Sequence, residues 1–279
     1  MSRIPFSQVL KKAKIDPRRE YDRLYSLFCI QTIPFYGRND ITLRGLLVNS
    51  FLKYPFRGTC ISLKDFDDCH GFHFKKDPLD FSLDYLVSFC EYSYNLVDYD
   101  SRINDGTRAM ELNQASRFYL RQVNMVIESV GYMGNKQDGI TDFVPKDPAV
   151  ISVAEIVAPE LSYKVIEYNH HSMKGDLERK RATLLVLADK LEAQKEKLKH
   201  ISASLKSDIF MLLNNMNIRH NNTDPNGKYY ISFVAAMKNE EIEHWYDELY
   251  QMCLLAFLEM DHSDRNASIE QLKQDIQTQ

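Results

Sequence analysis

Residues 176–216 read DLERKRATLLVLADKLEAQKEKLKHISASLKSDIFMLLNNM, and this stretch decides the fold. It lies between Gly175 and Pro225, in a window without glycine or proline, the residues that most often interrupt helices. Apolar residues recur mostly at intervals of three and four, as on one face of an amphipathic helix; they are Leu184, Leu187, Ala188, Leu191, Leu198, Ile201, Leu205, Ile209, Leu212 and Met216. The pattern predicts one helix of roughly forty residues, or two joined near residues 200–204, where strong helix formers thin out.

A second helix is predicted after Gly227, where glycine and proline are again absent. Asn239 can cap this helix, and acidic residues in its first turn complement the positive end of the helix dipole. Its apolar stripe consists of Ile242, Trp245, Leu249, Met252, Cys253, Ala256 and Met260. Residues 221–228 are rich in turn formers and predict a loop. Together these segments predict a helical hairpin, with a short extension over 229–234 crossing between its arms.

The chain before Gly175 has a less regular pattern. Helices are predicted over residues 19–32, 41–54, 79–97 and 108–132. The first two end where a proline follows, because the residue before proline disfavours the helical conformation. Residues 57–74, with two glycines and several aromatic residues, predict a loop or a short strand pair, and residues 134–148, with two glycines and two prolines, predict a hinge.

Length and composition complete the fold prediction. At 279 residues the chain exceeds the usual single-domain size, and 44% hydrophobic with 27% charged residues is typical of a folded protein. We predict an all-α or nearly all-α helical bundle with a long amphipathic helix, a C-terminal helical hairpin and small irregular or β content near 57–74. The hinge divides it into a mostly helical N-terminal region, 1–140, and a helical domain, 149–279.

Neither a secretory signal nor a membrane span is expected. No stretch approaches the ~20 apolar residues that a spanning helix requires, and the first fourteen residues have no continuous apolar run. The five cysteines are scattered, which is typical of reduced thiols: Cys29, Cys60, Cys69, Cys90 and Cys253. We therefore expect a cytoplasmic protein, in the cytosol or nucleoid, without a membrane partner.

Charge is unevenly distributed. The net charge of −4 and a pI near 6.1 argue against a protein that coats nucleic acid non-specifically, since such binding neutralises many phosphates at once. Residues 174–208 nevertheless contain nine Lys or Arg against six Asp or Glu, whereas residues 238–279 contain three against ten. An anionic partner is expected to meet the basic helix and to avoid the acidic tail.

Common catalytic signatures are absent from the sequence. There is no phosphate-cradling glycine loop, dinucleotide fingerprint or Gly-x-Ser-x-Gly elbow. Cys60, Cys69, His70 and His73 supply sulfur and nitrogen donors within fourteen residues, but their spacing matches no standard zinc finger. Buried cysteines and partly exposed histidines are the favoured interpretation, so we predict neither a metal nor a cofactor.

Residues 212–222, LLNNMNIRHNN, form the main candidate site. Five asparagines cluster in nine positions around Arg219 and His220, although asparagine is a mediocre helix former. If the helix persists, both side chains project along its buried stripe, because they follow Met216 by three and four residues. One hypothesis is an anion or RNA-phosphate site in which Arg219 binds phosphate and His220 transfers protons, while ligand-orienting amides come from Asn215, Asn217, Asn221 and Asn222.

A structural interpretation of the same residues stays open. Asn221 and Asn222 would then terminate the helix, while Arg219 and His220 would bond the free carbonyls of its last turn and complement the negative helix end. Residues 168–175, YNHHSMKG, allow the same two interpretations. His170, His171 and Lys174 could contact phosphate at the N-terminus of the following helix, or they form a loop in which Ser172 or Asp176 caps that helix.

The segment from about 165 to 262 resembles the HEPN superfamily. The resemblance rests on Tyr168-Asn-His-His-Ser-Met-Lys-Gly-Asp176 at its start, on Asn-x-Asn-Ile-Arg-His-Asn-Asn at the end of the long helix, and on the Trp-bearing acidic helix that follows. More narrowly, it looks like bacterial proteins grouped with abortive phage-infection systems. Many HEPN proteins are dimeric helical bundles that cleave RNA without a metal.

The resemblance implies roles for the two central residues. Arg219 would stabilise the pentacoordinate phosphate, and His220 would help to activate the ribose 2′-hydroxyl or protonate the leaving oxygen. The superfamily usually separates its arginine and histidine by several residues, whereas here they are adjacent. The alternatives are therefore that His220 acts in an altered geometry, that His170, His171 or a partner subunit supplies the histidine, or that the domain only binds.

The resulting prediction is metal-independent RNA cleavage or RNA binding in a bacterial defence or stress response. RNA, a second copy of the chain and a regulatory protein are the expected partners. Two rival hypotheses remain: a non-enzymatic helical interaction module, and a sensor that binds a phosphate ligand or nucleotide without turnover.

Overall fold

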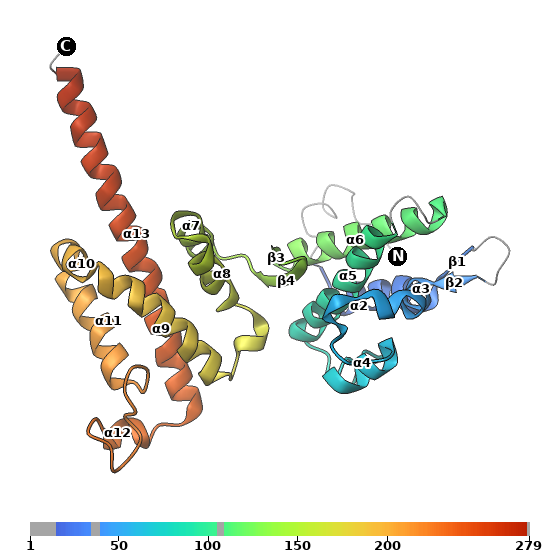
Figure 1. The fold of residues 1–279 in the computed structure, drawn as a ribbon, viewed down its shortest axis with the longest axis horizontal. Coiled ribbons are helices and arrows are strands. Elements are labelled where there is room, and N and C mark those ends of the chain that lie inside the picture. Colours follow the sequence, from blue (N-terminus) through green and yellow to red (C-terminus); the bar gives the residue numbers. More distant parts are fainter. Residues whose placement is uncertain (1–14, 35–39, 105–108, 278–279) are drawn as a thin grey trace, which may run out of the picture. The chain divides into compact units, whose positions relative to one another are not determined.

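The computed structural model describes residues 15–34, 40–104 and 109–277. The chain divides into two units, Met1–Pro145 and Lys146–Gln279, and each is described by itself. Helices dominate both, and within the described ranges the strands form two antiparallel two-stranded sheets (Figure 1). The predicted all-α or nearly all-α class is confirmed. In the same ranges, no helix is both long and apolar enough to cross a membrane.

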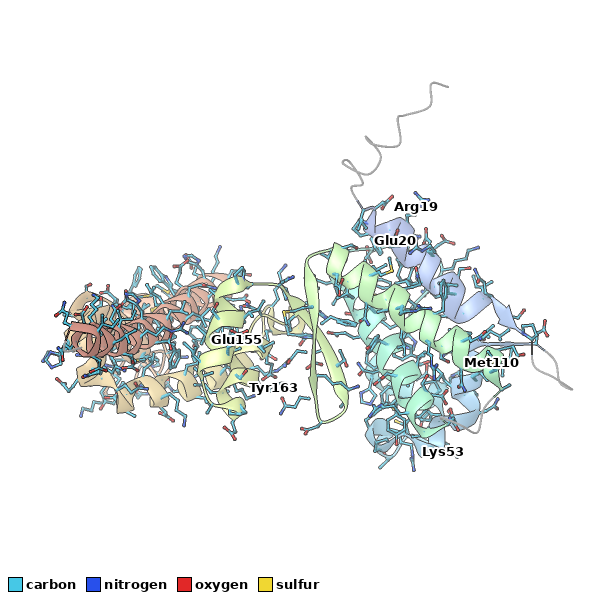
Figure 2. The ribbon with its side chains drawn as sticks, turned by 90° about the horizontal axis from the view of Figure 1, so that it is seen from above. Arg19, Glu20, Lys53, Met110, Glu155 and Tyr163 are labelled. Atoms are coloured by element: carbon cyan, nitrogen blue, oxygen red, sulfur yellow. The ribbon has the colours of Figure 1, made fainter. Side chains whose placement is uncertain are left out.

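The N-terminal unit contains five α-helices in its described part. They are α2 (Pro17–Tyr25), continued by the π-helical η1 (Ser26–Ile30), then α3 (Leu43–Ser50), α4 (Leu63–His70), α5 (Leu83–Ile103) and α6 (Met110–Ser129). Short 3-10 turns, η2 (Phe51–Lys53) and η3 (Pro55–Arg57), follow α3, and β1 (Thr32–Ile33) pairs with β2 (Ile41–Thr42). Figure 2 marks the start of α2 with Arg19 and Glu20 and the start of α6 with Met110. Helices therefore form in all four predicted segments of this unit.

The prediction for residues 57–74 is confirmed at 58–62 and 71–74, which are irregular, but it is wrong for the middle of the segment, which forms α4, and no strand is present. Ser62 caps the helix by accepting a hydrogen bond from the N–H of Asp65, and Gly71, with φ 73°, ends it in the left-handed conformation. Both are ordinary signals for a short helix.

The predicted hinge at 134–148 is mostly a β-hairpin. Strands β3 (Tyr132–Gln137) and β4 (Ile140–Pro145) pair antiparallel around Asp138 and Gly139, whose φ angles are 52° and 85°. An Asp-Gly pair is a strong hairpin signal because both residues tolerate positive φ. The units nevertheless divide inside the predicted segment, between Pro145 and Lys146.

All the helices and strands assigned in the described part of the C-terminal unit are helices. Its elements are α7 (Pro148–Ile156), α8 (Pro159–Glu167), the 3-10 turn η4 (His171–Met173), α9 (Leu177–Ala193), α10 (Lys195–Ile201), α11 (Ala203–Asn215), α12 (Ser232–Ala235) and α13 (Asn239–Gln277). The predicted long helix is thus three helices. The break at Ser202 lies in the predicted joint at 200–204, whereas the break at Gln194 was not predicted. Helices α9, α10 and α11 all pack against α13, and the breaks let the chain follow it.

The predicted hairpin, loop and extension are present in the C-terminal unit. Helices α11 and α13 are its arms, residues 221–228 form the loop, and α12 lies in the extension. The residues of the predicted apolar stripe over α9, α10 and α11 all belong to the core, and among them only Ile201 is half-buried. Trp245 was expected on the stripe of the second arm but is 39% exposed, and Tyr246 is buried in its place. Beyond Asp264 every described residue of α13 is exposed, and Figure 1 shows this end continuing past α10.

Candidate functional site

Helix α11 ends at Asn215, before the two central candidates. Met216 caps it with φ −105° and ψ 39°, and Asn217 adopts a left-handed φ of 57°. Asparagine tolerates this conformation better than most residues. The expectation that Arg219 and His220 continue the buried stripe of one helix is therefore wrong, because the chain turns before it reaches them.

The asparagines build the turn that follows α11. The N–H of Asn217 donates to Oδ1 of Asn222 (2.8 Å), and the N–H of Asn222 donates to Oδ1 of Asn217 (3.1 Å). The Nδ2 of Asn222 also donates to the carbonyl of Tyr229 (2.8 Å), and Asn222 is only 1% exposed. We name this reciprocal pair the Asn217–Asn222 lock. It satisfies part-buried backbone groups that no regular element serves.

The other two predicted ligand-binding asparagines also bond locally. Nδ2 of Asn215 donates to the carbonyl of Met211 (2.9 Å), which lies one turn back in α11. Oδ1 of Asn221 accepts hydrogen bonds from the N–H groups of Thr223 (3.2 Å) and Asp224 (3.1 Å), an Asx turn. Four of the five asparagines thus make local hydrogen bonds that shape the end of α11 and the loop after it.

Arg219 lies between a carboxylate and an aromatic ring. Its Nη2 is 2.8 Å from Oε2 of Glu192, and its guanidinium carbon is 5.2 Å from the ring centre of Phe210. The side chain remains 22% exposed. The structural interpretation expected the side chain of Arg219 to bond a carbonyl at the end of α11. In the turn that follows α11, the carbonyl of Ile218 instead accepts from Nε of Arg181 (2.8 Å).

Two lysines join Arg219 around Phe210. The Nζ atoms of Lys195 and Lys206 lie 4.6 Å and 5.6 Å from the ring centre, within the range of cation–π attraction. We name Lys195, Lys206 and Arg219, with the ring between them, the Phe210 cluster. Glu192 bonds Lys195 (2.8 Å) as well as Arg219, and the hydrogen bond from Lys195 is the main cause that lowers the pKa of its carboxyl. Two of the three cations bond this one carboxylate, so the cluster keeps a positive charge.

His220 has a different partner. Its ring stacks on that of Tyr229, with centres 3.9 Å apart and planes 14° apart. Tyr229 is exposed, and its carbonyl is held by Asn222, so the lock also positions this stack. In the described chain no hydrogen bond or ring contact joins the side chains of Arg219 and His220, although the two residues are adjacent.

The segment with His170, His171 and Lys174 precedes α9. Nδ1 of His170 is 2.7 Å from Oγ of Ser172, the two imidazole rings are 4.2 Å apart, and Lys174 is exposed. Asp176 caps α9 by accepting from the N–H of Arg179 (3.0 Å). Asp176 thus has the capping role that one of the two interpretations gave it, and phosphate contact by His170, His171 and Lys174 stays a prediction.

The two candidate segments lie toward opposite ends of α9. Glu192, the partner of Arg219, is in its last turn, and a helix of 17 residues is ~25 Å long. His170 and His171 of the same chain therefore do not supply the histidine beside Arg219.

An ion cluster around the buried Lys180, near the start of α9, was not predicted from the sequence. Nζ of Lys180 lies 2.7 Å from both Oε1 of Glu243 and Oδ1 of Asp247, and Lys180 is 5% exposed. Asp247 also accepts from the hydroxyl of Tyr168 (2.9 Å), and Glu243 from the N–H of Gly175 (2.7 Å). We name it the Lys180 cluster. Its signal was available, because Lys180 precedes Leu184 by four residues and so lies on the apolar stripe.

The histidines near residue 70 have separate partners, whereas Cys60 and Cys69 lie beside each other. The ring of His70 is tilted 56° against that of Phe66, with centres 4.6 Å apart, and Nδ1 of His73 lies 3.9 Å from Asp68. Cys60, Cys69, His70 and His73 do not form a group with metal-ligand spacing in the part of the chain that the structure describes.

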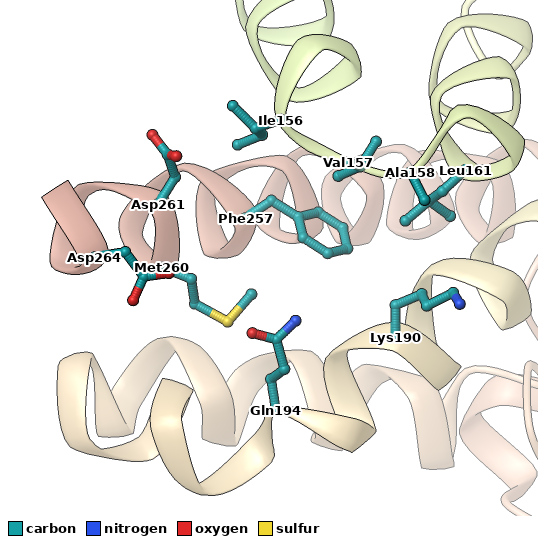
Figure 3. Close-up of a pocket in the computed structure, with 10 residues that line it drawn as sticks. All are labelled: Ile156, Val157, Ala158, Leu161, Lys190, Gln194, Phe257, Met260, Asp261 and Asp264. Carbon is teal, nitrogen blue, oxygen red and sulfur yellow. The ribbon is translucent and has the colours of Figure 1, made fainter.

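A pocket of about 320 Å³ beside the acidic part of α13 suits anions poorly. Figure 3 shows its lining: Ile156, Val157, Ala158, Leu161, Lys190, Gln194, Phe257, Met260, Asp261 and Asp264. The lining contains two carboxylates and one lysine, and Asp264 also binds Nζ of Lys197 (2.6 Å). The charge favours the Phe210 cluster over this pocket as an anion site.

Comparisons of the chain with protein-family models, curated proteins and solved structures find no match. The resemblance to the HEPN superfamily stays a prediction.

Proposed function

We propose that the C-terminal unit binds RNA through the Phe210 cluster, as part of a bacterial defence or stress response. One observation carries the proposal: Lys195, Lys206 and Arg219 converge on a single ring while one carboxylate serves two of them. Phosphate contacts from Lys and Arg supply most of the affinity in non-specific RNA binding. Arg219 would exchange Glu192 for a phosphate oxygen, and Glu192 can turn toward solvent because it is already exposed.

The neighbouring stack suits a nucleotide base. Tyr229 and His220 present stacked rings at a loop, and exposed aromatic rings bind bases of any sequence. Arg219 and His220 are consecutive residues, so one nucleotide could place its phosphate on Arg219 and its base on the His220–Tyr229 stack. Metal-independent cleavage is the finer part of the proposal, with Arg219 on the phosphate and His220 transferring a proton.

Removing a cation of the Phe210 cluster should weaken RNA binding, and removing the negative charge of Glu192 should strengthen it. Arg219→Ala and Lys206→Ala should each weaken binding of a short labelled single-stranded RNA about tenfold, which is ~1.4 kcal/mol. Glu192→Gln should strengthen binding several-fold, because it removes the anion that competes with phosphate. Fluorescence anisotropy over a series of salt concentrations measures all three.

Lys190→Ala, an exposed change in the same unit, is the matched control and should have little effect. The proposal fails if wild-type protein does not bind RNA at low salt, if Lys190→Ala weakens binding as much as Arg219→Ala, or if Glu192→Gln weakens it. An interaction module would show lower thermal stability for Arg219→Ala and no RNA affinity to lose. A sensor would bind a free nucleotide and not the RNA.

Cleavage is tested separately from binding. His220→Ala should abolish RNA cleavage that persists in EDTA and should weaken the anisotropy titration less than Arg219→Ala does, since Arg219, both lysines and the ring of Tyr229 remain. His244→Ala, at an exposed histidine of α13, is the control. If wild-type protein binds RNA without cleaving it, the function reduces to binding.

The proposal includes a homodimer. Ile269, Leu272 and Ile276 are exposed at the end of α13 and follow one another by three and four residues, as on a helix face that packs against another helix. Light scattering should give twice the chain mass of 32.6 kDa, and Leu272→Glu should give the mass of one chain. A monomeric wild-type protein would contradict this part alone.

A further inference from the structure

The N-terminal unit contains a cavity of about 480 Å³ with a charged and an aromatic side. Helices α2, α3, α4 and α5, the η1 turn and residues 72–75 contribute its lining. We name it the Arg44 cavity after the cation in its wall. Ligand sites in proteins usually have volumes of ~300–1,000 Å³, so the cavity is large enough for a small organic molecule.

The charged side is built around a buried carboxylate. The side chain of Asp67 is 6% exposed, its Oδ1 accepts from the hydroxyl of Tyr92 (2.8 Å), and its Oδ2 accepts from Nη2 of Arg44. Arg44 itself is 38% exposed. Asp67 therefore has its partners within the protein, and it holds the guanidinium of Arg44, which also contacts Tyr92 and lines the cavity. A guanidinium held in this way is preorganised for the two oxygens of a carboxylate or phosphate.

The aromatic side consists of rings from α2, η1, α5 and the segment after α4. Phe72 lies 5.1 Å and Phe74 lies 5.4 Å from the ring centre of Tyr92, and the other lining rings are those of Tyr25, Phe28 and Phe89. The segment that carries the two phenylalanines is held in place, since Lys75 donates its N–H to the hydroxyl of Tyr85 (3.1 Å) and accepts at its carbonyl from Tyr21 (2.5 Å). Fixed aromatic faces favour stacking with a flat ring.

The balance of charges in the lining favours an anion. Asp67 is neutralised by Arg44, and Asp68 is bound by Nζ of Lys64 (2.7 Å), which leaves Lys75 as an additional positive charge. Cys29 also lines the cavity, but burial raises the pKa of its thiol to about 11, so it is protonated near neutral pH. A protonated thiol is a poor nucleophile, and the site is suited to binding.

We propose that the Arg44 cavity binds a small aromatic anion, a flat ring bearing a carboxylate or phosphate, with the ring against Phe72 and Phe74 and the anion on Arg44. This site lies in the N-terminal unit and is independent of the RNA proposal. A purely structural Arg44–Asp67 tie would stabilise α3 against α4 but would not require an open cavity lined by aromatic rings.

The test is calorimetric titration of the full chain with matched pairs of probes. The anionic probes are 4-hydroxybenzoate, indole-3-acetate and AMP, and their neutral counterparts are 4-hydroxybenzamide, indole-3-acetamide and adenosine. At least one anionic probe should bind tenfold or more tightly than its neutral counterpart, and the carboxylate and phosphate arms identify the anion. The proposal is overturned if no anionic probe binds or if a neutral counterpart binds equally well.

Variants locate the site. Arg44→Ala would leave Asp67 buried without a cation and can unfold the unit, so Arg44→Lys is the decisive variant, because it keeps the charge and loses the fork. It should weaken the bound probe at least tenfold with little change in melting temperature. Phe72→Leu should weaken the aromatic probes and Arg18→Lys, outside the cavity, should not. Equal losses for Arg44→Lys and Arg18→Lys would place the ligand elsewhere and overturn the proposal.

Discussion

Asn222→Ala is expected to lower the free energy of unfolding of the C-terminal unit by about 2–4 kcal/mol. The side chain is 1% exposed and bonds the N–H of Asn217 and the carbonyl of Tyr229. Its removal leaves both part-buried backbone groups without this partner, at a cost toward the lower end of ~1–3 kcal/mol for each, and it also removes the packing of a buried side chain. Urea unfolding followed by the fluorescence of Trp245 measures this change in one unit, because Trp245 is the only tryptophan of the chain.

Two related variants separate the lock from a general effect of mutation in the loop. Asn222→Asp keeps the acceptor for Asn217 but sets a carboxylate oxygen against the carbonyl of Tyr229 at a buried position, so its loss of stability should be at least as large as that of alanine. Thr223→Ala, at the next residue, should change stability by less than about 0.5 kcal/mol. If Asn222→Ala matches Thr223→Ala, the reciprocal hydrogen bonds are not what holds the loop.

The lock also links stability to the proposed function. Arg219 and His220 lie between Asn217 and Asn222, and Asn222 holds the carbonyl of the tyrosine on which His220 stacks. A variant that loosens the lock should therefore weaken RNA binding even though it removes no cation. The asparagines, first considered as ligand groups, instead position the residues that would contact the ligand.

Helix positions in the C-terminal unit could be predicted because a periodic apolar face is a local property. Leu184, Leu187, Leu191 and Ile209 are all buried, as their spacing indicates. The break at Gln194 could not be predicted, because it depends on packing against α13, which is distant in sequence. Helix α4 and the Asp138–Gly139 hairpin were missed although their caps and turn residues were visible, since glycines and aromatic residues were given more weight.

Candidate site residues were harder to predict than the fold. Arg219 and His220 were identified by the unusual asparagine cluster, but their orientation depends on where α11 ends, and that depends on the left-handed Asn217. Lys195, Lys206 and Phe210 come from two helices, and only the fold brings them together. Lys180 was counted among the nine basic residues of 174–208, yet it is buried, because its partners lie on α13 more than sixty residues away.

Lys180→Ala is the second change with a large expected effect, a loss of about 2–3 kcal/mol in the stability of the C-terminal unit. Removing one partner of a fully buried ion pair costs ~3–5 kcal/mol. The loss expected here is smaller, because Asp247 is half-exposed. Glu243 and Asp247 would keep their charges without a cation between them. Lys180→Met should lose less, since it retains the packing of the stem, and Lys190→Met, at an exposed position of the same helix, should lose less than about 0.5 kcal/mol.

The pH dependence distinguishes the charge of Lys180 from its packing. Burial by itself raises the pKa of Glu243, but the N–H of Gly175 and the ammonium of Lys180 outweigh it, so the pKa lies below its ordinary value of 4.5. A carboxyl with a lowered pKa in the folded state stabilises the protein above pH 4.5, and this contribution is lost as the pH falls through the folded value. The difference in stability between wild type and Lys180→Met should therefore be largest near neutral pH and shrink below about pH 4.5. A difference that stays constant from pH 7 to pH 3 would mean that Lys180 stabilises α9 against α13 by packing alone.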